Sequence, residues 1–303
     1  MRKILTLLLL LTVLSNCKES DKKENIETKI EPVTDKKSTT EIKKNDLLEY
    51  NLKGKVKGFS AIKYKAKDSF GIVLKDGIHK DKYSSLSDYE ETISFNKEGY
   101  VTRKTKHNDG VLIWKENIIR DSLYRKIESN KFNSKNKLTG KQAFKYNKNG
   151  KISEMNAYKN DGDIEGKWIY IYEEKKMTRN NYNSDGSMYS SYISTYNDKG
   201  ALIEFKYLDY EERKYNYTNN YSYNVEENTK TKINKLYYSL ELEDTKWLSK
   251  YNESGDLIKK TLGDSYITKY EYEYDEQNNW TKQIEYSDGF PEFIIERKIN
   301  YFN

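Results

Sequence analysis

The chain has almost none of the residues on which thiol, metal and histidine chemistry depends. It has one Cys, two Pro and two His, at His79 and His107. The two His stand in unrelated segments, without the spacing of a zinc site or the partners of a catalytic triad, and we expect both at the surface. No glycine-rich phosphate loop follows a predicted strand. We therefore expect no metal site, no cofactor and no enzyme activity.

Apolar residues are also scarce. The hydrophobic residues make up 35% of the chain and include 29 Tyr, whereas charged residues reach 34%, against about 25% in an average domain. That balance alone favours disorder, but the 14% of aromatic residues favours a fold, because disordered chains are poor in aromatics. The formal charge of +6 is too small and too scattered for a nucleic-acid-binding surface.

A single apolar run, Leu5–Leu14, stands near the start of the chain after two basic residues. It is too short to span the ~30 Å hydrocarbon core of a bilayer, so residues 1–16 are interpreted as a signal peptide. The sequence Leu14–Cys17 resembles a bacterial lipoprotein signal. This resemblance implies that Cys17 is lipidated after cleavage and carries fatty-acid chains such as palmitate. Lys18 replaces the Asp that often retains lipoproteins at the inner membrane, which favours the outer membrane.

Residues 17–46 begin with this Cys and continue as a stretch rich in Lys, Asp and Glu with very few apolar side chains. Such a segment cannot bury enough surface to offset the entropy of ordering, so we expect a disordered tether about 30 Å in reach. The charged run 18–24 resembles the export tags of some surface lipoproteins, which favours exposure at the cell surface.

A five-residue turn motif recurs in residues 47–303: an aromatic residue, Asn or Asp, two polar residues and Gly. The Asn or Asp accepts backbone N–H bonds, and the fourth turn position takes a positive φ, which Gly adopts freely. Asp-Gly pairs, the preferred two-residue hairpin turns, form a second signal. The motif occurs at Phe95–Gly99, Tyr146–Gly150, Tyr182–Gly186, Tyr196–Gly200, Tyr251–Gly255 and Tyr274–Asn278, the last with Asn in place of Gly. The Asp-Gly pairs are Asp76-Gly77, Asp109-Gly110, Asp161-Gly162, Asp185-Gly186 and Asp288-Gly289.

Residues between these turns alternate in polarity with period two, as half-buried strands do. We therefore predict an all-β fold, an antiparallel meander of repeated hairpins with about twenty strands. Open sheets rarely exceed ~10 strands without curling or splitting, so we expect a curled or superhelical sheet, or two packed sheets. The segment Asn117–Glu128 is ambiguous, because its apolar residues also fit a helix. The strand that contains Trp168 is expected to be covered on both faces.

The stretch Tyr274–Trp280, followed by Tyr286 and Asp288-Gly289, resembles the YD-repeat (Rhs-like) family. The resemblance implies a β-hairpin repeat domain over residues 47–303. Large members of this family enclose a toxin in a β-shell, and we expect this chain to be too short for a closed shell. The resemblance therefore supports the fold and transfers no activity.

Four Trp are the candidate contacts for a partner, because aromatic side chains held on strands lose little entropy on binding. Three functions stay open: a non-catalytic outer-membrane lipoprotein that binds a protein or glycan, an immunity-type lipoprotein that neutralises a toxin, and a carboxylate-based glycan hydrolase. Strand packing is the competing explanation for each aromatic. The candidates are Trp114, Trp168, Trp247 and Trp280.

Overall fold

The computed structural model describes residues 45–79, 90–211, 216–236, 245–263 and 265–303. The predicted signal peptide, Cys17 and nearly all of the predicted tether lie outside the described residues. Their assignment stays a prediction from the sequence.

Within these ranges, one antiparallel sheet of 19 strands follows a short 3-10 helix, η1, at Asp46–Tyr50. Consecutive strands pair with each other from β3 to β19, as the repeated turn motifs predict. The all-β meander is therefore confirmed. The strands are β1 (Val56–Ser69), β2 (Ile72–Ile78), β3 (Glu90–Phe95), β4 (Val101–Asn108), β5 (Val111–Arg120), β6 (Lys126–Asn133), β7 (Leu138–Tyr146), β8 (Ile152–Tyr158), β9 (Ile164–Tyr172), β10 (Lys176–Asn183), β11 (Met188–Tyr196), β12 (Leu202–Asp209), β13 (Tyr217–Asn224), β14 (Thr229–Leu236), β15 (Thr245–Tyr251), β16 (Leu257–Leu262), β17 (Tyr266–Tyr274), β18 (Trp280–Ser287) and β19 (Phe290–Tyr301).

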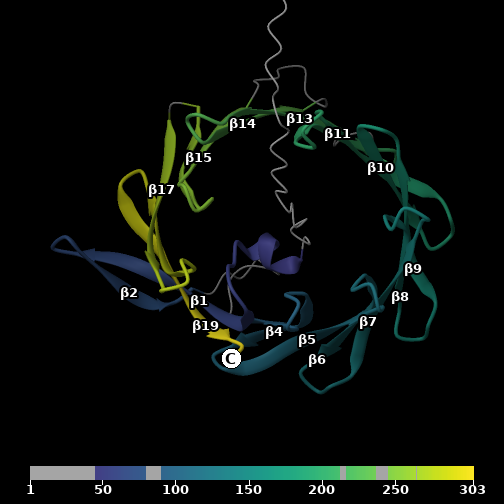
Figure 1. Cartoon of the computed structure of the whole chain (residues 1–303), viewed down its shortest axis with the longest axis horizontal. Helices are drawn as coiled ribbons and strands as arrows, with labels where there is room; N and C mark the ends of the chain where they lie inside the picture. Colours follow the sequence, from purple (N-terminus) through teal and green to yellow (C-terminus); the bar gives the residue numbers. More distant parts are fainter. Residues whose placement is uncertain (1–44, 80–89, 212–215, 237–244, 264) are drawn as a thin grey trace, which may run out of the picture. The chain divides into compact units, whose positions relative to one another are not determined.

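The long strand β1 closes the sheet. Its first part, Gly58–Ala61, pairs with β3, and the same strand pairs with β19 from Val56 to Lys65. The two ends of the meander thus meet at one strand, and the sheet forms an 18-stranded barrel with β2 as a hairpin extension of β1 (Figure 1). The expected curled or superhelical open sheet, or two packed sheets, is therefore wrong. Closure pairs the edge strands that an open sheet would leave with unpaired N–H and C=O groups.

The five-residue motif forms the turn that its residues predict. The Asn147 side-chain oxygen accepts hydrogen bonds from the backbone N–H groups of Asn149 and Lys151, each at 3.0 Å. The fourth position has a positive φ, 74° at Gly150 and 57° at Asn278. Asn278 thus occupies the position that Gly holds in the other copies, at a cost in strain that Asn tolerates.

The Asp-Gly pairs do not all form two-residue turns. Asp109-Gly110 and Asp288-Gly289 do, with positive φ at both residues. Asp161-Gly162 and Asp185-Gly186 occupy the end of longer turns, in which the Gly N–H bonds to the carbonyl three residues earlier. Asp76-Gly77 lies within β2, next to a register shift in its pairing with β1, so the expected turn there is wrong.

Two further expectations are corrected. Residues 117–128 form the end of β5 and the start of β6, so the helical alternative is wrong. The face of β9 opposite Trp168 is not covered, because Ile171 is 47% exposed.

The hydrophobic core is small and lies where η1 meets the closing strands. Leu47 of η1 and Leu52 pack with Phe59 of β1 and Ile93 of β3. The rings of Tyr50 and Phe59 pack edge to face, with centroids 5.5 Å apart. Apolar burial is thus concentrated beside the strand that closes the barrel.

Candidate binding wall inside the barrel

Cross-strand pairing defines one continuous face of the sheet that includes the residues packed against η1. Directly opposite residues of paired strands lie on the same face. Phe59 lies opposite Ile93, Ile93 opposite Lys104, and Lys104 opposite Glu116. η1 lies within the ring of strands, so this is the face toward the interior (Figure 1). We call it the inner face, and the opposite one the outer face.

All four candidate Trp lie on the inner face, on β5, β9, β15 and β18. Trp280 is buried at 9% exposure, whereas Trp114, Trp168 and Trp247 are half-buried. The structure thus brings the four rings onto one surface but distributes them around the barrel. Trp280 belongs to the packing beside η1, and the other three line the wall.

The wall between β5 and β17 is lined by half-buried side chains and by buried small polar ones such as Asn181 and Ser190. Eight strands already enclose an interior that side chains can fill, and 16 to 18 strands leave an aqueous channel. The described core residues lie near η1, so they leave the far wall without apolar cover. A group of aromatic rings on β11 to β13 illustrates this lining: Tyr192 lies 4.9 Å from Tyr207, and Tyr207 lies 5.4 Å from Tyr217, centroid to centroid.

Cations stack on several of the inner aromatic rings. The Lys131 ammonium lies 4.6 Å from the ring centre of Trp114. Arg179 lies 4.1 Å from the ring of Tyr192. Each arrangement is a favourable cation–π contact, and it keeps a positive charge at the interior surface. The inner face therefore offers rings and positive charge together.

Burial changes the proton equilibria of several inner-face side chains on β17 to β19. It raises the pKa of Tyr270 to about 12, so this phenol keeps its proton further into alkaline pH than an exposed tyrosine does. Burial also raises the pKa of the Glu285 carboxyl, and the nearby Glu292 adds to this effect, whereas Lys63 and Lys260 oppose it. Burial lowers the pKa of Arg297 to about 10, and its guanidinium lies 3.4 Å from the Trp280 ring centre.

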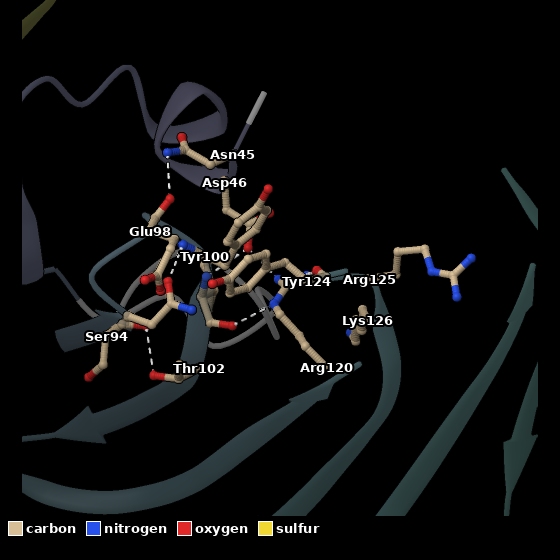
Figure 2. Close-up of polar contacts among 12 residues, drawn as sticks. Asn45, Asp46, Ser94, Glu98, Tyr100, Thr102, Arg120, Tyr124, Arg125 and Lys126 are labelled. Atoms are coloured by element: carbon tan, nitrogen blue, oxygen red, sulfur yellow. Dashed lines mark hydrogen bonds and ion pairs between the residues drawn. The ribbon is translucent and has the colours of Figure 1, made fainter. Parts of the chain in front are cut away.

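The segment that enters the barrel is fixed to the turn between β3 and β4 and to the end of β5 (Figure 2). The Asn45 amide donates a hydrogen bond to the carbonyl oxygen of Glu98 at 2.8 Å. The Asp46 carboxylate accepts a hydrogen bond from the Val101 N–H at 2.7 Å and forms an ion pair with Arg120. Both ionised side chains are largely buried, at 19% and 14% exposure, so they must stay paired.

The same segment is fixed to two turns on the other side of β1. The Asn51 amide donates to the Asp256 carboxylate at 2.6 Å, in the turn between β15 and β16. The Lys53 N–H donates to the Asn279 side-chain oxygen at 2.7 Å, and the Asn279 amide donates to the Lys53 carbonyl at 2.9 Å. Residues 45–53, which we call the N-terminal clamp, therefore connect strands on both sides of β1.

The outer face carries cross-strand ion pairs beside exposed apolar residues such as Ile171 and Leu248. Lys145 lies 2.9 Å from Glu154, directly opposite on the next strand. Lys282 lies 2.7 Å from Glu273 in the same relation on β17 and β18. Exposed pairs of this kind contribute little to stability, about 0–1 kcal/mol each. The four Trp rings, by contrast, all lie on the inner face.

Sequence reasoning found the aromatic residues and missed the clamp and the inner cations. The alternation of Tyr266 to Tyr274 correctly predicts one shared face. Nothing in the sequence ties Asn51 to Asp256 or Lys53 to Asn279, because those residues are more than 200 positions apart. The Lys residues on the inner face alternate with polar residues and look like an ordinary solvated face.

Within the described ranges, no helix is long and apolar enough to traverse a bilayer.

No family model and no curated protein matches the chain. Among solved structures, a porin-like protein from Bacteroides uniformis is 8% identical, with a TM-score of 0.38 over 82% of this chain and 98% of that protein. TcdB2-TccC3 without its hypervariable C-terminal region is 8% identical, with a TM-score of 0.20 over 72% of this chain and 16% of that one. Likenesses this weak do not transfer a function. The resemblances to YD-repeat proteins and to lipoproteins stay predictions.

Proposed function

We propose that the protein is a non-catalytic binding protein of the bacterial outer membrane, lipid-anchored at Cys17, which holds a glycan chain against the inner face of its barrel. The observation that carries the proposal is the set of half-buried aromatic rings, several with a stacked cation, distributed along this face. A distributed surface suits an extended ligand better than a small molecule, which needs a single enclosed pocket.

The charged residues of the outer face support a barrel that is tethered to the membrane and does not span it. Membrane-spanning barrels present an apolar band about 25 Å tall to the lipid, and charges in its middle cost roughly 2–4 kcal/mol each. Here charged outer-face residues such as Lys115 in β5 and Lys206 in β12 occupy mid-strand positions. A lipid at Cys17 would supply the attachment in place of the barrel wall.

The test compares inner and outer aromatic residues in the full chain, released from the membrane by Cys17→Ser. Titration calorimetry with dextran and with dextran sulfate measures binding. Trp168→Ala and Trp247→Ala should weaken binding several-fold. The matched control is Phe132→Ala, which removes an outer-face ring with Lys115 stacked on it. The proposal is wrong if Phe132→Ala weakens binding as much as the inner variants do.

Two competing functions give different results in the same preparations. A toxin captured from neighbouring cells in preference to any polysaccharide would favour the immunity-type lipoprotein. Release of reducing sugar that is lost in Glu285→Gln, with an unchanged melting temperature, would favour the hydrolase, because Glu285 is an inner-face carboxyl whose pKa is raised by burial.

A further inference from the structure

A cluster of three lysines lies on the inner face where β13 to β16 run side by side. Lys230 lies directly opposite Ser249, and Ser249 directly opposite Lys260, so the two lysines flank one serine. Lys232 lies opposite Trp247 in the next row of the same face. The three ammonium groups therefore converge on neighbouring positions of one surface.

These side chains enclose a small pocket of about 260 Å³. Its volume lies just below the ~300–1,000 Å³ of pockets for drug-sized ligands, which suits one residue of a longer chain. No carboxylate of the described part of the chain lines it. The lining residues are Tyr221, Lys230, Lys232, Trp247, Ser249, Tyr251 and Lys260.

Within the described ranges, the positive charges of this pocket have no acidic side chain beside them in its lining. Burial lowers the pKa of Lys230, and burial together with the charges of Lys260 and Lys230 lowers the pKa of Lys232. Glu285 is an inner-face carboxyl whose pKa is lowered by the charge of Lys260, but it does not line the pocket. Grouping like charges in this way disfavours the empty state, and a bound anion would relieve the repulsion.

Another inner cavity, of about 420 Å³ beside the N-terminal clamp, shows the contrast. It also holds several cations, but acids line it with them. Arg120 pairs with Asp46 there, and Lys126 lies 3.4 Å from Glu116. That cavity is neutralised from within the protein. Among the residues that the structure describes, no acid lines the lysine pocket on β13 to β16.

Aromatic rings hold two of the three ammonium groups in place. The Lys260 ammonium lies 4.2 Å from the ring centre of Trp247, and the Lys230 ammonium lies 4.6 Å from that of Tyr221. Rings of this kind pack against the C–H faces of sugars, and ordered ammonium groups beside them form charge-assisted hydrogen bonds to an acidic group.

We propose that this pocket binds an acidic sugar residue, with the sulfate or carboxylate at Lys230, Lys232 and Lys260 and the sugar ring at Trp247 and Tyr221. The proposal rests on the proposed function, because it names the class of glycan that the inner face selects.

The experiment uses the full chain with Cys17→Ser and titration calorimetry at 150 mM salt. Dextran and dextran sulfate share a backbone and differ in charge, and polygalacturonate tests a carboxylate in place of a sulfate. We expect dextran sulfate or polygalacturonate to bind at least tenfold more tightly than dextran. Lys230→Gln with Lys260→Gln should remove that preference, so that dextran sulfate and dextran bind with similar affinity.

The matched control is Lys250→Gln with Lys259→Gln, which removes two positive charges from an opposed pair on the outer face of the same region. This control should keep the preference for the charged polymer. If both double variants lose the preference for the charged polymer equally, the attraction is nonspecific and the proposal is wrong. The proposal is also wrong if an oligothymidylate binds more tightly than dextran sulfate and polygalacturonate do. The inner double variant should also melt at the same or a higher temperature, because it relieves repulsion.

The two proposals fail in different ways. If dextran and dextran sulfate bind equally and Trp247→Ala weakens both, the acidic-sugar assignment is wrong and the glycan-binding function stands. If no polysaccharide binds, the proposed function itself is wrong.

Discussion

Replacing Asn279 by Ala should release one side of the N-terminal clamp. The Asn279 side chain is fully buried and makes three hydrogen bonds: it accepts from the Lys53 N–H at 2.7 Å, and it donates to the Lys53 carbonyl at 2.9 Å and to the Tyr301 hydroxyl at 2.8 Å. At about 1 kcal/mol net for each bond, Asn279→Ala should lower the free energy of unfolding by about 3 kcal/mol. For a chain of this size the melting temperature should fall by roughly 6–12 °C.

Thermal unfolding followed by tryptophan fluorescence provides the measurement. The matched control is Asn278→Gly in the same turn. Asn278 is exposed and has a φ of 57°, a conformation that Gly adopts without strain. The free energy of unfolding of this control should stay within about 0.5 kcal/mol of that of the wild type. Asn279→Asp should be intermediate, because it keeps the acceptor for the Lys53 N–H but faces the Lys53 carbonyl with an oxygen. A melting temperature of Asn279→Ala within 2 °C of the wild type would refute the reasoning.

Three further predictions concern the turns, an inner carboxyl and the anchor. Gly200→Val should lower the free energy of unfolding in urea by about 1–2 kcal/mol, because Gly200 has a φ of +75° and open space around it, so that only backbone strain opposes the substitution. The control Gly140→Ala, at an ordinary φ and also in open space, should lower it by less than about 0.5 kcal/mol. Burial raises the pKa of Glu285 in the folded state, so the free energy of unfolding of the wild type should fall as the pH rises from the unfolded-state pKa through the folded-state pKa. Glu285→Gln should remove this loss and should have the same stability as the wild type at lower pH. A variant whose stability has the same pH profile as the wild type would contradict the prediction. Cys17→Ser should abolish metabolic palmitate labelling and release the protein from membranes, and continued fractionation with the outer membrane would exclude the anchor.

Local features of this fold could be predicted because their causes lie within a few residues. Asn147 and Gly150 form their turn through bonds inside one five-residue segment, and the same chemistry recurs in the other copies. The shared face of Tyr266 to Tyr274 follows from the period of a strand. Asp76-Gly77 failed as a turn because its pairing with β1 continues past the pair, a partnership that no local signal encodes.

The sequence by itself determined the strands, the turns that join them and the aromatic character of one face. Only the tertiary structure decided that this face is an interior, because closure depends on the pairing of one strand with two strands far away in the sequence. β1 pairs with both β3 and β19, and the N-terminal clamp holds that junction through Asn51 and Lys53. Strand register decided the pocket at Lys230 and Lys260, because residues 30 positions apart meet only when β14, β15 and β16 pair in the observed register. The twist, register and edge pairing of the sheet depend on contacts between strands across the whole sheet, whereas each turn depends only on the residues of its own hairpin.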